Sequence, residues 1–148
     1  MSIFSSFNIN SSGLTAQRYR MDIISQNLAN TNTTRTEDGT PYRRKVVTFT
    51  EKNTQTTFSR VLNEATDRYC GTGVKVNGVY EDTWNELIQT YDPSHPDADE
   101  NGYVWYPNVN VVTEMTDMID ASRAYEANAT AFTASKAIAL KGLEMGKA

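Results

Sequence analysis

The sequence predicts a mainly α-helical protein whose long N- and C-terminal helices pair like a coiled coil, with a small antiparallel β domain between them. Near the N-terminus, apolar residues recur every seven positions: Phe7, Leu14, Met21 and Leu28. The same spacing returns near the C-terminus: Met118, Tyr125, Phe132 and Ala139. The middle of the chain is polar, and its short apolar runs are rich in β-branched and aromatic residues.

Composition favours a part that assembles with others. The chain has 148 residues, of which 39% are hydrophobic, a low share for a compact domain. We therefore expect neighbouring molecules to complete some of its core. The net charge of −4 gives no reason to expect nucleic acid as a partner. No apolar run is long enough to span a membrane, and the first residues lack the pattern of an ordinary secretory signal.

The N-terminal stripe predicts a helix over residues 3 to about 30, with Ile3 and Ile24 three residues off the stripe. Ser12 and Gly13 interrupt its first turns, so a helix that begins at Ser12 as N-cap, after a loose lead, stays open as an alternative. Asn30 is a plausible stop, and residues 30–41 are expected to form a loop.

The middle segment is expected to hold several short strands. Residues 42–50 and 73–80 are typical of strands, the second with a bend at its Asn-Gly pair, Asn77 and Gly78. Residues 87–91 and 103–106 are further candidates, separated by a turn-rich loop, and residues 58–65 are ambiguous.

The C-terminal pattern predicts a helix from about Asn110 to Leu143, capped by Asn108 or Asn110. Glu114 lies early in it and Lys136 late, an order that suits the helix dipole. The predicted domains are thus a helical coiled-coil core, residues 1–30 with 109–148, and a loop plus β module, residues 31–108.

The chain offers few residues for chemistry. The segment with Asp97, Asp99, Asn101 and Gly102 fits the first half of a calcium loop. Asn108, however, stands where such a loop needs a bidentate Glu, so a solvated turn is favoured. His95 is the single histidine, with no second His or Cys nearby to complete a metal site or triad. We expect no catalytic, cofactor-binding or metal-binding residues.

The basic run Arg43, Arg44 and Lys45 is too short to indicate nucleic-acid binding in an acidic chain. We expect these side chains to pair with acidic groups on a neighbour or to face solvent. The apolar stripes are instead the candidate subunit interface: Phe7, Leu14, Met21, Ile24, Leu28, Met115, Met118, Tyr125 and Phe132.

The end of the first predicted helix, Gln26-Asn27-Leu28-Ala29-Asn30-Thr31, resembles the signature of bacterial flagellar axial proteins of the rod and hook. Residues 38–45, 91–99, 101–103, 106–109 and 114–128 are similar to its proximal-rod members. In the wider family the signature soon runs into Pro-Gly-Tyr, whereas here the corresponding Pro41-Tyr42 follows an extended loop, as suits the proximal-rod subgroup. The family-motif positions are Asn27, Leu28, Ala29, Asn30, Pro41, Tyr42, Arg43 and Arg44.

The resemblance implies a structural subunit of the flagellar basal-body proximal rod, without cofactor or enzymatic activity. Such a protein polymerises through its terminal helices, transmits torque for motility, and lies in the basal body across the periplasm. It would be exported by the flagellar type III apparatus without a cleavable signal peptide. Its implied partners are other rod subunits, copies of itself, and neighbouring ring and export-gate proteins.

Two other functions stay open at this point. A flagellar or secretion-system adaptor or chaperone could hold its partners through the same helices. A calcium-dependent adhesin-like module could use Asp97, Asp99 and Asn101.

Overall fold

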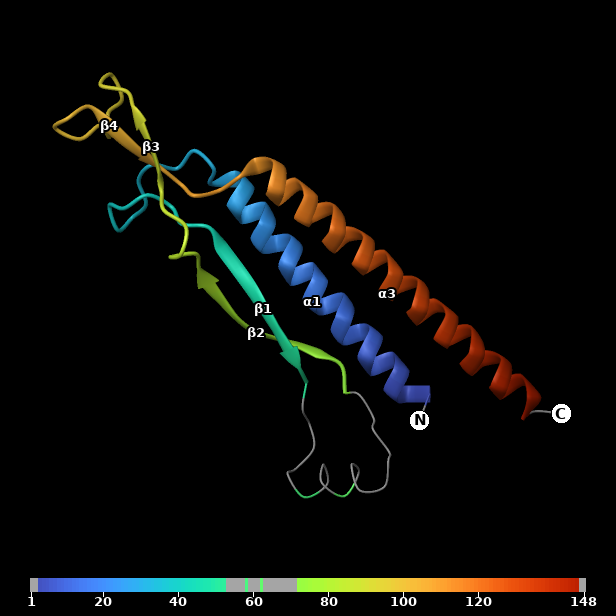
Figure 1. The fold of residues 1–148 in the computed structure, drawn as a ribbon. Helices are drawn as coiled ribbons and strands as arrows, with labels where there is room; N and C mark the ends of the chain where they lie inside the picture. Colours follow the sequence, from blue (N-terminus) through green and yellow to red (C-terminus); the bar gives the residue numbers. More distant parts are fainter. Residues whose placement is uncertain (1–2, 53–57, 59–61, 63–71, 147–148) are drawn as a thin grey trace. The chain divides into compact units, whose positions relative to one another are not determined.

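The computed structural model describes residues 3–52, 58, 62 and 72–146, with side chains from Ser5 onward. Its two long helices are α1 (Ile3–Ala29) and α3 (Val111–Met145). Between them in sequence lie β1 (Lys45–Glu51), β2 (Val74–Glu81), β3 (Ile88–Tyr91) and β4 (Tyr103–Tyr106). The strands form two separate two-stranded antiparallel sheets, β1 with β2 and β3 with β4 (Figure 1). The predicted fold class is confirmed.

The chain divides into two compact units, each holding part of both helices. Unit 1 consists of residues 1–18, 49–77 and 122–148, and unit 2 of residues 19–48 and 78–121. This division cuts across both helices, whereas the predicted one separates helices from strands. The predicted domain boundaries therefore stay a prediction.

The helices run antiparallel within each unit. In unit 1, the rings of Phe7 and Phe132 meet edge to face, with centroids 5.1 Å apart. In unit 2, Asn27 hydrogen bonds to Glu114 and Arg20 pairs with Asp117. In both units, residues nearer the C-terminal end of α1 contact residues nearer the N-terminal end of α3. The pairing of the two apolar segments expected from the sequence is thus present.

Helix α1 passes through Ser12 and Gly13 without a break, so a helix start at Ser12 is wrong. The Ser12 hydroxyl donates to the Ile9 carbonyl at 2.7 Å and accepts from the Val74 amide at 3.0 Å. It therefore links α1 to β2 and does not cap a helix. A Cβ at Gly13 would lie 2.8 Å from Asn128 Oδ1, so the glycine lets α1 approach α3 closely. The side chain of Ile3 lies outside the described part.

Asn110 caps α3, because its Oδ1 accepts from the amides of Val112 at 3.0 Å and Thr113 at 3.3 Å. The alternative cap, Asn108, has another role: its Oδ1 accepts from the Arg44 amide at 2.9 Å. Asn108 Nδ2 also donates to the Asp82 carbonyl, so this residue joins the start of β1 to the end of β2.

The strands differ from prediction in one place. β1 begins at Lys45, not at residue 42, because Tyr42 and Arg44 are held by side-chain contacts before the strand begins. β2 continues through Asn77 and Gly78, and the alternation of its burial is interrupted at Gly78 and Val79. The expected bend there stays a prediction. Gly78 lies within the paired strand, and its carbonyl accepts from the Thr48 hydroxyl at 3.4 Å. Of the ambiguous residues 58–65, only 58 and 62 are described.

The close helix crossing gives a first prediction. Gly13→Val should lower the free energy of unfolding by about 1–3 kcal/mol, because the new side chain must displace Asn128 or separate the helices. The measurement is urea unfolding followed by circular dichroism.

The matched control is Gly142→Val, at a helical glycine whose Cβ would have no atom within 4 Å. This variant should change stability by less than about 0.5 kcal/mol. Equal stability of the two variants would contradict the close crossing.

Candidate subunit interface

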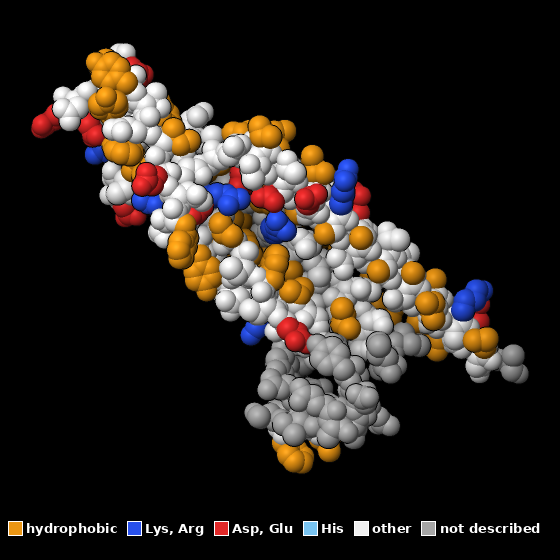
Figure 2. All heavy atoms as spheres, viewed as in Figure 1, with side chains coloured by type: hydrophobic (Ala, Val, Ile, Leu, Met, Phe, Trp, Pro, Cys, Tyr) orange, Lys and Arg blue, Asp and Glu red, His pale blue; other side chains and the backbone are white. Residues whose placement is uncertain are grey.

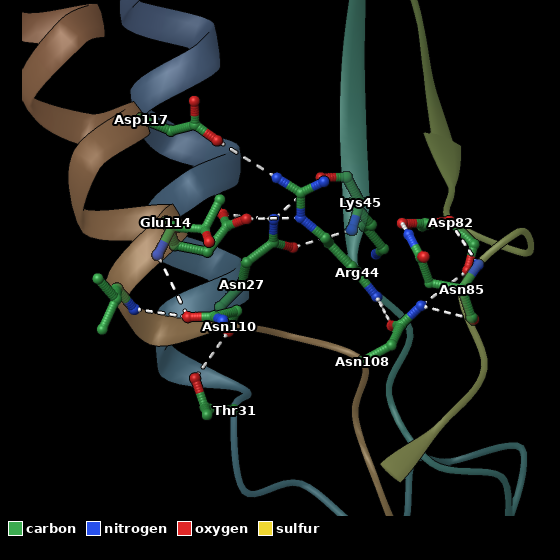
Figure 3. A network of polar contacts seen from close by, with 12 residues as sticks. Asn27, Thr31, Arg44, Lys45, Asp82, Asn85, Asn108, Asn110, Glu114 and Asp117 are labelled. Carbon is green, nitrogen blue, oxygen red and sulfur yellow. Dashed lines mark hydrogen bonds and ion pairs between the residues drawn. The ribbon is translucent and has the colours of Figure 1, made fainter.

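Glu114 is fully buried near the start of α3, where an unpaired carboxylate would be very costly. Its Oε1 accepts from Arg44 Nε at 2.6 Å, and its Oε2 accepts from Asn27 Nδ2 at 3.0 Å (Figure 3). Arg44 also contacts Asp117 at 3.3 Å, and Arg20 contacts the other oxygen of Asp117 at 3.1 Å. Two arginines thus balance two carboxylates within unit 2.

The side chain of Asn27 uses its full hydrogen-bonding capacity. Its Nδ2 donates to Glu114 and to the Lys45 carbonyl at 2.9 Å. Its Oδ1 accepts from the Tyr42 hydroxyl at 2.8 Å and from the Lys45 amide at 2.9 Å. One amide therefore fixes α1 to α3, to the start of β1 and to the loop before it. We call Asn27, Tyr42, Arg44 and Glu114 the polar anchor.

Tyr42 is buried in this anchor, and Lys45 Nζ lies 5.6 Å from the centre of its ring. Burial, with smaller contributions from the charges of Glu114 and Glu81, raises the pKa of Tyr42 to about 12. The phenol therefore stays neutral and keeps donating to Asn27 over the whole physiological range of pH.

The predicted interface residues are only partly covered by their own chain. On α1, Ile24 is buried, while Phe7, Leu14, Met21 and Leu28 are half-buried. On α3, Met118 and Phe132 are half-buried, whereas Met115 is 55% and Tyr125 is 37% exposed. The most deeply buried α3 positions are Glu114 and Ala121, which lie four residues before Met118 and Tyr125. The predicted stripe therefore borders the intramolecular contact and remains partly available to a neighbour.

The structure brings three of the family-motif residues together in the polar anchor: Asn27, Tyr42 and Arg44. Leu28, Asn30, Pro41 and Arg43 are half-buried, and Ala29 is exposed. The expectation that Arg44 pairs with a neighbouring molecule or faces solvent is wrong. Its partners, Glu114 and Asp117, belong to its own chain.

The sequence analysis missed the role of Glu114. It noted only that an acidic residue early in the C-terminal helix suits the helix dipole. A signal was present, since Glu114, Ala121 and Asn128 also recur every seven residues. A carboxylate in such a register needs a buried cation, and the Arg43-Arg44-Lys45 run could supply one. Only the fold shows which of the three basic residues reaches it.

Apolar side chains also lie open along α3 (Figure 2). In unit 2, Val112, Met115 and Ile119 are 74%, 55% and 51% exposed and follow the spacing of one helix face. In unit 1, Ile138 and Leu143 are each 66% exposed. An exposed apolar cluster such as that of Val112, Met115 and Ile119 indicates contact with other proteins.

The calcium-loop segment is tied to protein groups. Asp97 accepts from the Thr34 hydroxyl at 2.8 Å and lies 3.7 Å from Arg35, while Asp99 accepts from Trp105 Nε1 at 3.1 Å. Within the described part of the chain, no three His, Cys, Asp or Glu side chains gather as metal ligands. His95 Nδ1 accepts from the Asp97 amide at 3.1 Å, which is a role in the turn.

Known proteins are similar to this chain in both terminal regions and over nearly its whole length. Residues 7–35 match the family model of the flagella basal body rod protein, and residues 100–145 that of the flagellar basal body rod FlgEFG protein C-terminal region. The chain is 48% identical to the flagellar basal-body rod protein FlgC of Borreliella burgdorferi, over 93% of each chain. It is 44% identical to FlgC of Bacillus subtilis, over 99% of this chain and all of that one. For FlgC of Salmonella typhimurium the identity is 38%, again over 99% and 100% of the two chains.

The polar anchor gives the second prediction. Glu114→Ala should lower the free energy of unfolding by about 2–4 kcal/mol, because it leaves Arg44 and Asn27 without their buried acceptor. Urea unfolding measures the loss. Glu144→Ala is the control, since its 2.7 Å pair with Lys141 is exposed and should contribute less than about 0.5 kcal/mol. Similar losses in both variants would argue against the anchor.

Tyr42 gives the third prediction. Its pKa of about 12 lies above the usual 10.0, so above pH 10 the unfolded chain loses a proton that the folded chain keeps. The stability contribution is complete below pH 10 and is lost as the pH rises towards 12. Between pH 9 and pH 11, wild-type stability should therefore fall by roughly 1 kcal/mol more than that of Tyr42→Phe in urea titrations. Parallel losses would show that Tyr42 titrates normally.

Proposed function

Because this chain belongs to the FlgC family of flagellar basal-body rod proteins and is a structural subunit of that rod, we propose that it polymerises there through its terminal helices. The observation that carries this proposal is the incomplete cover of both helices by their own chain. Met115, Tyr125 and Ile119 are more than one third exposed on α3, although they lie on or beside its heptad stripe.

In this proposal, neighbouring subunits bury the exposed stripes. Each square ångström of apolar surface removed from water contributes about 25 cal/mol, so several side chains per contact add up to a useful association energy. The polar anchor fixes α3 against α1 inside unit 2, so the exposed face is presented in a defined orientation. A subunit held in register by buried hydrogen bonds suits a shaft that transmits torque.

We further place the subunit in the proximal rod, across the periplasm, after export by the flagellar type III apparatus. Its neighbours there would be other rod subunits, copies of itself, and ring and export-gate proteins. Support for these points comes from the resemblance of the motif regions to proximal-rod proteins. Of the described helices, none has the apolar length that crossing a membrane requires.

A structural part needs no active site, and we propose no enzymatic activity. The adaptor or chaperone alternative is not supported, because the full-length relatives are named as rod proteins.

Substituting Met115 and Ile119 together by Asp tests the proposal. Both side chains are more than half exposed, so the monomer should keep its helical circular dichroism spectrum. Two charges on the buried face of an assembled rod should abolish rod formation and swimming in a strain that carries only this copy. Electron microscopy of isolated basal bodies and soft-agar motility measure the outcome.

The control is Thr113→Asp, which adds a charge at an exposed position on a different side of the same helix turns. It should leave rods and swimming intact. Normal rods with the double variant would contradict assembly through this face.

A further inference from the structure

The β3–β4 hairpin has an open aromatic face. In its register, Tyr91 pairs with Tyr103, and Gln89 pairs with Trp105, which places these four side chains on the same face. Tyr91 is 64% exposed, and Tyr103 and Trp105 are 39% exposed each. On the other face, Val104 is fully buried, whereas Ile88 is 52% exposed and Thr90 is exposed as well. The hairpin therefore packs mainly through Val104 and leaves three aromatic rings of the first face in contact with solvent.

Acidic side chains border this face. Asp92 follows Tyr91 directly, and Asp99 accepts from Trp105 Nε1 at 3.1 Å. Among the described residues, Asp92, Asp99 and the exposed Glu100 have no Lys or Arg within ion-pair distance. Aromatic faces beside carboxylates that have no Lys or Arg partner suit basic side chains, which can stack on the rings and pair with the acids. The open face thus fits a basic protein surface.

The chain itself carries such a surface. Between Lys75 and Arg123 there is no Lys or Arg, while the same stretch holds ten Asp and Glu. Unit 2 as a whole has five Lys and Arg against thirteen Asp and Glu. The described residues of unit 1 have the opposite balance, with six Lys and Arg against three Asp and Glu. The six described cations of unit 1 are all exposed: Arg18, Lys52, Lys75, Arg123, Lys136 and Lys141.

Two of these cations stand at a groove. Lys52 and Lys75 line an open depression of about 450 Å³ in unit 1. Polar residues of α1 and the apolar residues Ala16, Val74 and Val76 complete its lining. Two lysines beside apolar side chains suit a segment that is both acidic and aromatic.

We propose that the open face of the β3–β4 hairpin docks on the basic surface of unit 1 in a second copy of this chain. The two surfaces differ, so the contact is heterologous and can repeat from copy to copy, as a helical assembly requires. The inference rests on the proposed rod function and adds a second contact, independent of the helix faces. Opposite charges on the two units would favour this arrangement over contacts between like units.

Photocrosslinking in assembled rods tests the contact. Tyr91→p-benzoylphenylalanine keeps a large aromatic side chain at the most exposed ring of the face. Irradiation should yield a covalent dimer on denaturing gels, and mass spectrometry should place the attachment in unit 1 of the second copy. Thr90→p-benzoylphenylalanine is the matched control, because Thr90 is the neighbouring exposed residue on the opposite face. It should give little dimer.

A charge reversal provides the second arm. Glu100→Lys, combined with the Tyr91 crosslinker, should reduce the dimer yield by about threefold at low salt, since it replaces attraction by repulsion at an exposed site.

The outcomes separate this inference from the rod function. Assembled rods that give no dimer, or that crosslink only to another protein or to unit 2, would overturn the docking while leaving the rod assignment intact. A chain that never enters rods would remove both.

Discussion

The buried carboxylate of Glu114 is the constraint on which unit 2 depends. A charge without solvent contact is stable only with well-placed donors, and here Arg44 and Asn27 supply them at 2.6 Å and 3.0 Å. Arg44 lies just before β1 and Asn27 lies on α1. Hydrogen bonds to the two carboxylate oxygens of Glu114 therefore fix three segments that are distant in sequence: α1, the start of β1, and α3. Apolar packing alone would tolerate sliding of α3 along α1, whereas a hydrogen-bonded charge accepts one register.

Next to this fixed register, much apolar surface stays uncovered. Val112 is 74% exposed and Met115 is 55% exposed on the same helix that carries Glu114. A monomer gains little from such residues, because they improve neither its core nor its solubility. Their placement makes sense in an assembly, where neighbours remove them from water. The anchor and the open stripe are therefore complementary: the first sets the geometry of the subunit, and the second provides the association energy.

Charge is distributed with a similar division. Unit 2 carries most of the acidic residues, while the described cations of unit 1 are all exposed. Within unit 2, Arg20 and Arg44 neutralise the carboxylates of Glu114 and Asp117, and Arg35 pairs with Asp97. Asp92, Asp99 and Glu100, in contrast, have no Lys or Arg within ion-pair distance among the described residues. Internal ion pairs thus serve the fold, and the remaining carboxylates remain available for contacts with other molecules.

The sequence by itself determined the two long helices, their pairing, the small β part between them, and the membership in a family of assembling proteins. Periodicity over many residues is a local property, so the stripes at Phe7–Leu28 and Met118–Ala139 could be recognised without a structure. Tertiary structure decided the rest: that Gly13 admits Asn128, that Asn108 joins two strands rather than capping α3, and that Arg44 serves its own chain. These choices depend on which side chains meet across more than sixty residues of sequence, and no local pattern carries that information.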